Sequence, residues 1–208
     1  TCALPIWMTQ CEITIGSDPE LLNAMYASGC FALSFGLESI TQESLDTLEK
    51  PWAQVAKYDT WLRTIRDHGI TLSTEMVIGA DGDTLKSIQN TAKAVAKWKI
   101  AVPRFYILTP IPGTLFFKQM ATSDRLYNTN IYDYTGDKAV HLPKHMSPED
   151  LTSAYWRLYK EVYSIKNILA RTLLTSHAYK YPLRTLFYLY INFYYRHHIH
   201  RGITPNIM

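Results

Sequence analysis

Three short polar stretches of this 208-residue sequence hold residue types that a binding or catalytic site needs, and each directly follows an apolar run. They are GLES (36–39), IGADGDT (78–84) and TPIPGT (109–114). The first offers one carboxylate, the second a glycine and two carboxylates, and the third a turn that two prolines make rigid. If the apolar runs are parallel strands, all three stretches lie at the carboxyl ends of those strands, where such folds bind ligands.

Each stretch also has a purely structural explanation. Glu38 could cap the turn that follows it, Asp83 and Thr84 are favoured at helix N-termini, and TPIPGT could be a stiff corner. Asp81 and Asp83 alternate as in a calcium loop, but the third acid and the distal Glu are missing, so calcium is not expected. The common position of the stretches is therefore the stronger indication of a site.

Other chemistry finds little support in the sequence. It contains no GxGxxG, Walker or GxSxG motif. Histidines in HLPKH (141–145) and RHHIHRG (196–202) could bind a metal, although exposed histidines near a chain end rarely do so. Cys2, Cys11 and Cys30 lie 9 and 19 positions apart, which matches neither a zinc site nor a disulfide framework and favours a reducing cytosol.

The hydrophobic pattern predicts the elements that would position the three stretches. We expect strands at 11–15, 31–36, 72–78 and 105–108, alternating with helices at 17–29, at 42–68 with an interruption at Pro51, and at 84–98. The expected N-caps are Ser17 or Asp18, Thr41, and Asp83 or Thr84. This alternation implies a parallel sheet, and strands this apolar suggest helices on both faces. A doubly wound open sheet and half of an α/β barrel both fit.

The remainder of the chain has a different pattern and a different charge. Residues 115–150 look irregular, a helix follows from Ser147 to about residue 174, and an aromatic helix begins after Pro182. In the first of these helices, Tyr155, Tyr159 and Tyr163 recur at helical spacing and are expected in the core.

Charge separates the two parts as well, with a net charge of −4 for residues 1–150 and +7 for residues 151–208. The basic part could contact an anionic membrane surface or nucleic acid, although a solvated helical tail is the simpler explanation. The sequence has neither the regions of a signal peptide nor an apolar window of the ~18 residues that span a bilayer.

An ordered series of motifs resembles a known family. It comprises WMTQCEITIGSDPELLNAMYASGC, FALSFGLESITQESL, IRDHGI, MVIGADGDT, YILTPIPGT and YDYTGDKAVHLPKHMSPEDL. Over about residues 7–175, this series resembles the C-terminal half of the radical S-adenosylmethionine domain, in the subgroup with a cobalamin-binding domain. The resemblance implies an α/β fold: a partial (β/α) barrel, second half only, at 7–115, followed at 116–208 by a C-terminal extension that is first irregular and then helical.

The resemblance also implies cofactors and binding residues. Family members hold a 4Fe–4S cluster on a CxxxCxxC loop and bind S-adenosylmethionine on its remaining iron, for radical formation or methyl transfer through cobalamin. Carried over by motif, Glu38 and Ser39 would lie near the methionine or ribose of that cofactor, and Ile78 and Gly79 would border its adenine. Pro110, in TPIPGT, would help to close the cavity.

The sequence departs from the family pattern in one respect that matters. CxxxCxxC is absent, and Cys2, Cys11 and Cys30 lie too far apart to replace it. The strands correspond to the third to sixth of the family, so we expect this chain alone to bind no cluster and to need the N-terminal half of its parent. TCALPI (1–6), read as ACG TGT GCT CTT CCG ATC, matches the end of a sequencing adapter; an ordinary loop is the alternative.

The resulting expectation is a fragment of an enzyme. The parent would transfer methyl groups, or perform a related radical reaction, on a small-molecule or lipid-like substrate in the cytoplasm, at most peripheral to the inner membrane face. No nucleic acid is expected. The alternative is a non-catalytic interaction or membrane-surface module that uses the basic aromatic tail.

Overall fold

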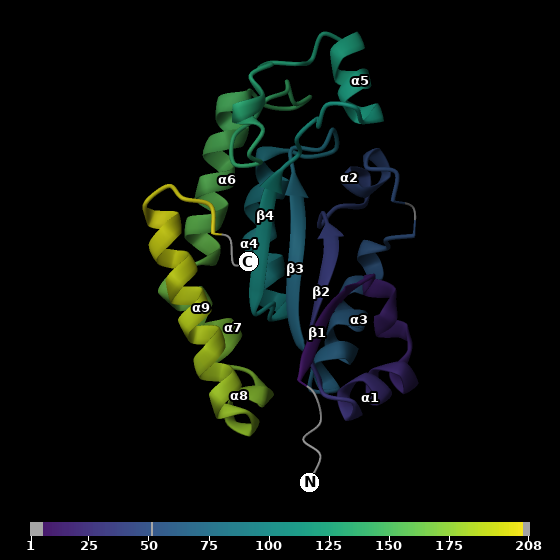
Figure 1. The fold of residues 1–208 in the computed structure, drawn as a ribbon, viewed down its shortest axis with the longest axis vertical. Coiled ribbons are helices and arrows are strands. Elements are labelled where there is room, and N and C mark those ends of the chain that lie inside the picture. The colour runs from purple at the N-terminus through teal and green to yellow at the C-terminus, as the bar shows by residue number, and fades with distance from the viewer. Residues whose placement is uncertain (1–5, 51, 206–208) are drawn as a thin grey trace.

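A four-stranded parallel sheet organises the fold and confirms the expected α/β class. The computed structural model describes residues 6–50 and 52–205, apart from the side chains of residues 176 and 177. The strands are β1 (Trp7–Cys11), β2 (Cys30–Glu38), β3 (Thr71–Ile78) and β4 (Val102–Ile107). They neighbour one another in chain order and all point the same way (Figure 1). We call the edge at which they end the carboxyl edge.

The helices between the strands begin and end largely where the sequence predicts. They are α1 (Pro19–Ala27), α2 (Gln42–Thr47), α3 (Val55–Asp67) and α4 (Leu85–Trp98). Asp18, Thr41 and Thr84 accept hydrogen bonds from backbone N–H groups in the first turns of α1, α2 and α4, so each is an N-cap as expected. Gly29 and Gly69 follow α1 and α3 with φ of +97° and +86°, the left-handed conformation that glycine favours.

The strand predicted at 11–15 is wrong. β1 ends at Cys11, and Ile13–Ser17 form a 3₁₀ turn, η1, in which Ile13 is buried. Gly16 explains the difference, because a Cβ built on it would lie 2.5 Å from the Cβ of Trp61 on α3. The chain must turn beneath α3 at this point, so the alternating apolar residues serve a tight turn instead of a strand.

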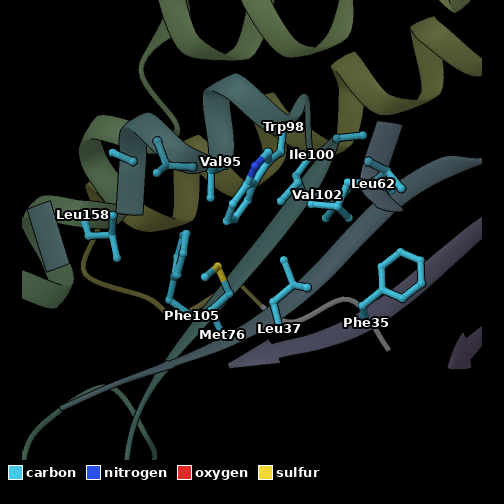
Figure 2. Packing of buried hydrophobic residues seen from close by; sticks show 14 of the residues in the cluster. Phe35, Leu37, Leu62, Met76, Val95, Trp98, Ile100, Val102, Phe105 and Leu158 are labelled. Atoms are coloured by element: carbon cyan, nitrogen blue, oxygen red, sulfur yellow. The ribbon is translucent and has the colours of Figure 1, made fainter. Parts of the chain in front are cut away.

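One face of the sheet carries the hydrophobic core. Phe35, Leu37, Met76 and Phe105 point from the strands toward the helices, where they meet side chains of α3, α4 and the later helix α6 (Pro148–Val162) (Figure 2). Their burial removes a large apolar area from water, which is the main favourable term in folding.

The opposite face of the sheet is more polar and is only partly buried, so the prediction that helices cover both faces is confirmed fully for one face alone. The strand register places Gln10, Ser34, Ser73, Glu75 and Arg104 together on this side, which we call the polar face. The side chains of Glu75 and Arg104 are 34% and 21% exposed. The strands therefore alternate between core and polar positions, a pattern of a sheet with one open side.

The C-terminal half is more ordered than its sequence suggests. Its elements are α5 (Leu115–Thr122), η2 (Ile131–Asp133), α6 (Pro148–Val162), α7 (Ile165–Thr172), α8 (Ser176–Lys180) and α9 (Pro182–His200). Residues 115–150 are thus not wholly irregular, because they include α5 and η2. Thr114 is the N-cap of α5. The single helix expected from Ser147 to residue 174 is divided, because Ser164 caps a new helix, α7, after a break at Tyr163.

No helix in the described part of the chain has the length and apolarity needed to cross a bilayer.

Side chains from this half cover the outer edge of β4. The hydroxyl of Tyr159 donates to the carbonyl oxygen of Phe105 (3.1 Å) and accepts from its N–H (2.9 Å). Tyr163 donates to the carbonyl oxygen of Pro103 (2.7 Å), a residue that has no N–H to offer a further strand. Both tyrosines are buried, as the sequence predicts. The helices therefore close an edge that another strand would otherwise occupy.

Candidate functional site

The three polar stretches all lie at the carboxyl edge, and hydrogen bonds join the second stretch to α2 and to the residue that follows β4. The carboxylate of Asp83, after β3, accepts from the Ser44 hydroxyl on α2 (2.6 Å) and from the Gly79 N–H (2.8 Å). The N–H of Leu108, after β4, donates to the carbonyl oxygen of Ile78 (2.8 Å). Burial raises the pKa of the Asp83 carboxyl, and the surrounding donors oppose that rise. Asp83 therefore positions the edge and is not available to a ligand.

Glu38 occupies an unusual backbone position at the end of β2. Its φ is +61°, the register with β3 shifts beside it, and the N–H of Ser39 donates to the carbonyl oxygen of Leu37 (2.8 Å) across it. A non-glycine residue in this region costs about 1–3 kcal/mol, and such positions cluster at functional sites.

Gly36 and Lys50 fix the Glu38 side chain. The carboxylate pairs with the Lys50 ammonium, and only 16% of the Glu38 side chain is exposed. A Cβ built on Gly36 would lie 2.6 Å from the Glu38 Oε1, so glycine at this position leaves room for the carboxylate. Ser39, which is buried, accepts from the N–H of Thr41 (3.2 Å).

Ile78 and Gly79 have backbone polar groups that already form hydrogen bonds within the protein. Ile78 is buried in the core, and Gly79 has a φ of +90°. The N–H of Gly79 is bound by Asp83, and its carbonyl oxygen accepts from Nε2 of His141 (3.2 Å). A Cβ on Gly79 would lie 2.5 Å from a methyl carbon of Leu151, so packing against α6 also demands glycine. Neither backbone polar group of Gly79 is left for a ligand.

Asp81 joins the carboxyl edge to the segment between α5 and α6. Its carboxylate accepts two hydrogen bonds from Arg125 (2.6 and 2.9 Å) and pairs with Lys144 (3.1 Å). These partners, Arg125 first, hold the pKa of the Asp81 carboxyl below its usual range. The buried His141 has its pKa lowered by desolvation, so it is neutral at pH 7. Arg125, His141 and Lys144 therefore attach the segment 123–147 to this edge.

A cavity of about 470 Å³ opens at the carboxyl edge between the end of α2 and α5. Glu49, Asp81, Thr109 and Phe116 are among its lining residues, which combine carboxylates with apolar surface. Pro110 is buried directly beside this lining, in the turn that leads to α5. The cavity is large enough for a small molecule or for part of a larger one.

The polar face carries functional candidates that the sequence prediction missed. Gln10 Nε2 donates to Oε1 of Glu75 (3.2 Å), and Arg104 pairs with the same carboxylate. The Ser34 hydroxyl and Nε of Arg104 are buried without a hydrogen-bond partner among the described residues. A buried polar group without a partner is costly, so these atoms are suited to a polar ligand. The alternation in TLSTEMVI (71–78) was the sequence signal for this face.

The described residues do not fit an iron–sulfur cluster. Cys11 is half-buried and Cys30 is buried, while Cys2 lies outside the described residues. Burial raises the pKa of the Cys11 thiol to about 11, so it is not a ready thiolate ligand. No group of three or more His, Cys, Asp or Glu side chains in the described part could hold a metal ion.

The curated proteins to which this chain is similar are enzymes. The chain is 31% identical over 178 residues to bacteriochlorophyllide d C-8(2)-methyltransferase and 28% identical over 165 residues to bacteriochlorophyllide d C-12(1)-methyltransferase, both of Chlorobaculum tepidum. It is also 22% identical over 161 residues to the anaerobic magnesium-protoporphyrin IX monomethyl ester cyclase of Cereibacter sphaeroides. These matches cover 77–80% of this chain but only 26–39% of the length of the relatives.

The fold is also similar to that of a solved structure, the radical S-adenosylmethionine methyltransferase TsrM from Kitasatospora setae with cobalamin and a [4Fe–4S] cluster bound. The TM-score is 0.50 at 19% identity, and the match covers 71% of this chain and 30% of that protein. No model of a known protein family matches the sequence.

Proposed function

We propose that this chain is the second half of the barrel, with its C-terminal extension, of a radical S-adenosylmethionine enzyme that transfers methyl groups with the help of cobalamin. The observation that carries the proposal is the similarity to two methyltransferases over about four fifths of the chain. The chain order of the parallel strands and the polar face agree with a half barrel whose inner side faces a ligand.

The polar groups of this chain would hold the organic cofactor or the substrate. Ser34 and Arg104 have unpartnered polar atoms on the polar face, which fit the carboxylate or hydroxyls of S-adenosylmethionine. Glu38, fixed by Lys50, and Ser39 would lie toward its methionine or ribose.

Ile78, Gly79 and Pro110 would contribute shape only. The backbone N–H and carbonyl oxygen of Gly79 and the carbonyl oxygen of Ile78 already have protein partners. Bound S-adenosylmethionine supplies the methyl group or the 5′-deoxyadenosyl radical of the reaction.

The cluster and cobalamin would be held elsewhere in the parent polypeptide. The described residues offer no set of cluster ligands, and the chain matches less than two fifths of each methyltransferase. This chain alone is therefore proposed to be inactive. The substrate class proposed is a small molecule or lipid-like compound, handled in the cytoplasm.

Anaerobic reconstitution of the full-length gene product with iron and sulfide tests this proposal. We expect iron–sulfur absorbance, cleavage or demethylation of S-adenosylmethionine, and cobalamin bound at one equivalent. A colourless full-length protein that leaves S-adenosylmethionine intact would contradict the proposal.

A second candidate function is contact with an anionic membrane surface through α9. Leu183, Leu186, Phe187 and Tyr190 recur at helical spacing and are 82%, 61%, 51% and 68% exposed. Residues 151–208 carry a net charge of +7. An apolar helical face with basic surroundings is the pattern of an interfacial helix.

Flotation of the full chain with phosphatidylglycerol vesicles tests this second function. The double substitution Leu183→Ser and Leu186→Ser should abolish flotation. Leu115→Ser is the matched control, because Leu115 of α5 is also exposed. Equal flotation of both variants would exclude α9 as the contact.

A further inference from the structure

A small cavity lies at the opposite end of the sheet from the carboxyl edge. Its volume is about 50 Å³, and it lies at the amino ends of β3 and β4, where Thr71 and Ala101 line it. Four cationic side chains also line it: Arg66 of α3, Lys99 after α4, Arg171 of α7 and Arg184 of α9. None of the lining residues carries a carboxylate, and these four cations form no ion pair in the described part of the chain. We call it the basic cavity.

Arg171 is the most deeply buried of the four. It is 2% exposed, donates to the carbonyl oxygen of Val162 and to Oδ1 of Asn192 (2.5 Å), and stacks on the Tyr163 ring at 4.7 Å. Its Nε is buried without a partner among the described residues. Burial lowers the pKa of its guanidinium to about 10, so the group still carries its charge at pH 7. A full positive charge is thus buried with a donor unused.

Lys99 occupies a position that normally suits glycine. Its φ is +56°, at the left-handed end of α4, and its ammonium donates to the carbonyl oxygen of Ala170 on α7 (2.9 Å). Glycine or asparagine at this position would relieve the backbone, whereas lysine brings a positive charge to the lining of the basic cavity.

Backbone carbonyl oxygens explain part of this arrangement. Arg66 donates to the carbonyl oxygen of Trp98 (3.0 Å) and Arg184 to that of Gly69 (2.7 Å). Cations at helix C-termini are favourable. Carbonyl oxygens satisfy single donors but neutralise no charge, and four like charges around one cavity repel one another. A buried charge without a counter-charge is strongly unfavourable.

We propose that the basic cavity binds a phosphoryl group. Arginine and lysine residues from four separate elements line the cavity, a set that suits a compact oxyanion with several acceptor oxygens, and arginine binds phosphate with particular strength. The group would belong either to a soluble phosphorylated compound or to a lipid headgroup. An apolar groove of about 690 Å³, lined by Phe31, Leu183 and Phe187, shares Arg184 with the cavity, so a lipid could be accommodated as well.

Thermal unfolding of the full chain with inorganic phosphate tests the proposal, with potassium chloride at equal ionic strength as the reference. Phosphate should raise the unfolding midpoint by several degrees more than chloride does. Lys99→Met should weaken phosphate binding about tenfold, the loss of one charge-assisted hydrogen bond. Lys97→Met on the same helix is the matched control, because Lys97 is exposed and pairs with Asp59.

Two results would overturn the proposal: equal stabilisation by phosphate and chloride, or an equal response of the Lys99 and Lys97 variants. Isothermal titration calorimetry with inorganic phosphate gives the affinity directly if a variant changes the unfolding midpoint by itself.

Vesicles of phosphatidic acid and of phosphatidylcholine then separate the two sources. Binding to phosphatidic acid that Lys99→Met abolishes assigns a lipid headgroup, and phosphate binding without vesicle binding assigns a soluble compound.

Discussion

The hydroxyl of Tyr159 satisfies both backbone polar groups of Phe105, accepting from its N–H at 2.9 Å and donating to its carbonyl oxygen at 3.1 Å. One side chain thereby replaces the two hydrogen bonds that a neighbouring strand would have made. The two rings also meet edge to face, with centroids 5.1 Å apart.

Tyr159→Phe is therefore expected to destabilise the chain by about 2–4 kcal/mol, because it leaves a buried donor and a buried acceptor without partners. Urea unfolding followed by circular dichroism measures the change. Tyr132→Phe is the control, since Tyr132 is 85% exposed. A loss below about 0.5 kcal/mol would mean that water replaces the hydroxyl.

Gly79→Ala should lower the free energy of unfolding more than Gly113→Ala does, although both glycines have a φ near +90°. The added methyl overlaps Leu151 at position 79 and meets nothing within 4 Å at position 113. We expect a loss of about 1 kcal/mol at Gly113 from backbone strain and about 2–4 kcal/mol at Gly79 from strain and overpacking. Leu151→Ala should recover part of the Gly79 loss in the double variant; similar losses for the two glycine variants would refute the packing explanation.

The pair between Asp81 and Arg125 should make stability depend on acid pH. The pKa of Asp81 is lower in the folded chain, so its contribution is present above the unfolded value of ~3.9 and is lost as the pH falls through the folded value. Asp81→Asn should lower the free energy of unfolding by about 1 kcal/mol at pH 7, because solvent screens a pair that is partly exposed. This loss should become progressively smaller below pH ~4.

Urea titrations between pH 3 and 7 measure this difference. Asp67→Asn is the control, because Asp67 is exposed and forms no ion pair in the described part of the chain. If the difference in free energy of unfolding between Asp81→Asn and the unmodified chain did not change with pH, the pair would not be the cause of the pH dependence.

Arg104→Met should reduce the proposed methyl transfer by the full-length protein about tenfold or more, because the polar face would lose its cationic donor. Glu75 is partly exposed, so the unfolding midpoint should change little. Arg63→Met, on the other side of the sheet in an exposed pair with Asp59, should leave turnover unchanged. Equal turnover of the two variants would remove the polar face from the proposed site.

The free edge of β1 is expected to make the isolated chain oligomeric or poorly soluble. Among the described residues, β1 pairs only with β2, and Met8 and Thr9 are exposed on it. Thr9→Lys places a charge on this edge and should shift the chain toward a monomer in size-exclusion chromatography with light scattering. A monodisperse monomer of the unmodified chain with cooperative melting would show that the edge is harmless.

Local chemistry made much of this fold predictable. The N-caps Asp18, Thr41 and Thr84 and the helix-ending Gly29 follow from hydrogen bonding and φ preferences within a few residues. The order of strands and helices follows from the apolar periodicity, and this order implies that the three polar stretches share one edge.

Distant contacts account for what the sequence did not reveal. Gly16 turns the chain because Trp61, 45 positions later, packs against it. Glu75 and Arg104 were overlooked because pairing across neighbouring strands, and not the residues within one strand, brings them together with Gln10. The basic cavity likewise requires Arg66 and Arg184, which are far apart in the sequence.

The covering of β4 also determines when the sheet can be completed during synthesis. Tyr159 lies 54 positions after Phe105, so at about 5–20 residues per second roughly 3–11 s pass between their synthesis. Throughout that interval β4 is an open edge on the nascent chain. In this interval wrong strand pairing competes with folding, because an unpaired strand edge is exposed.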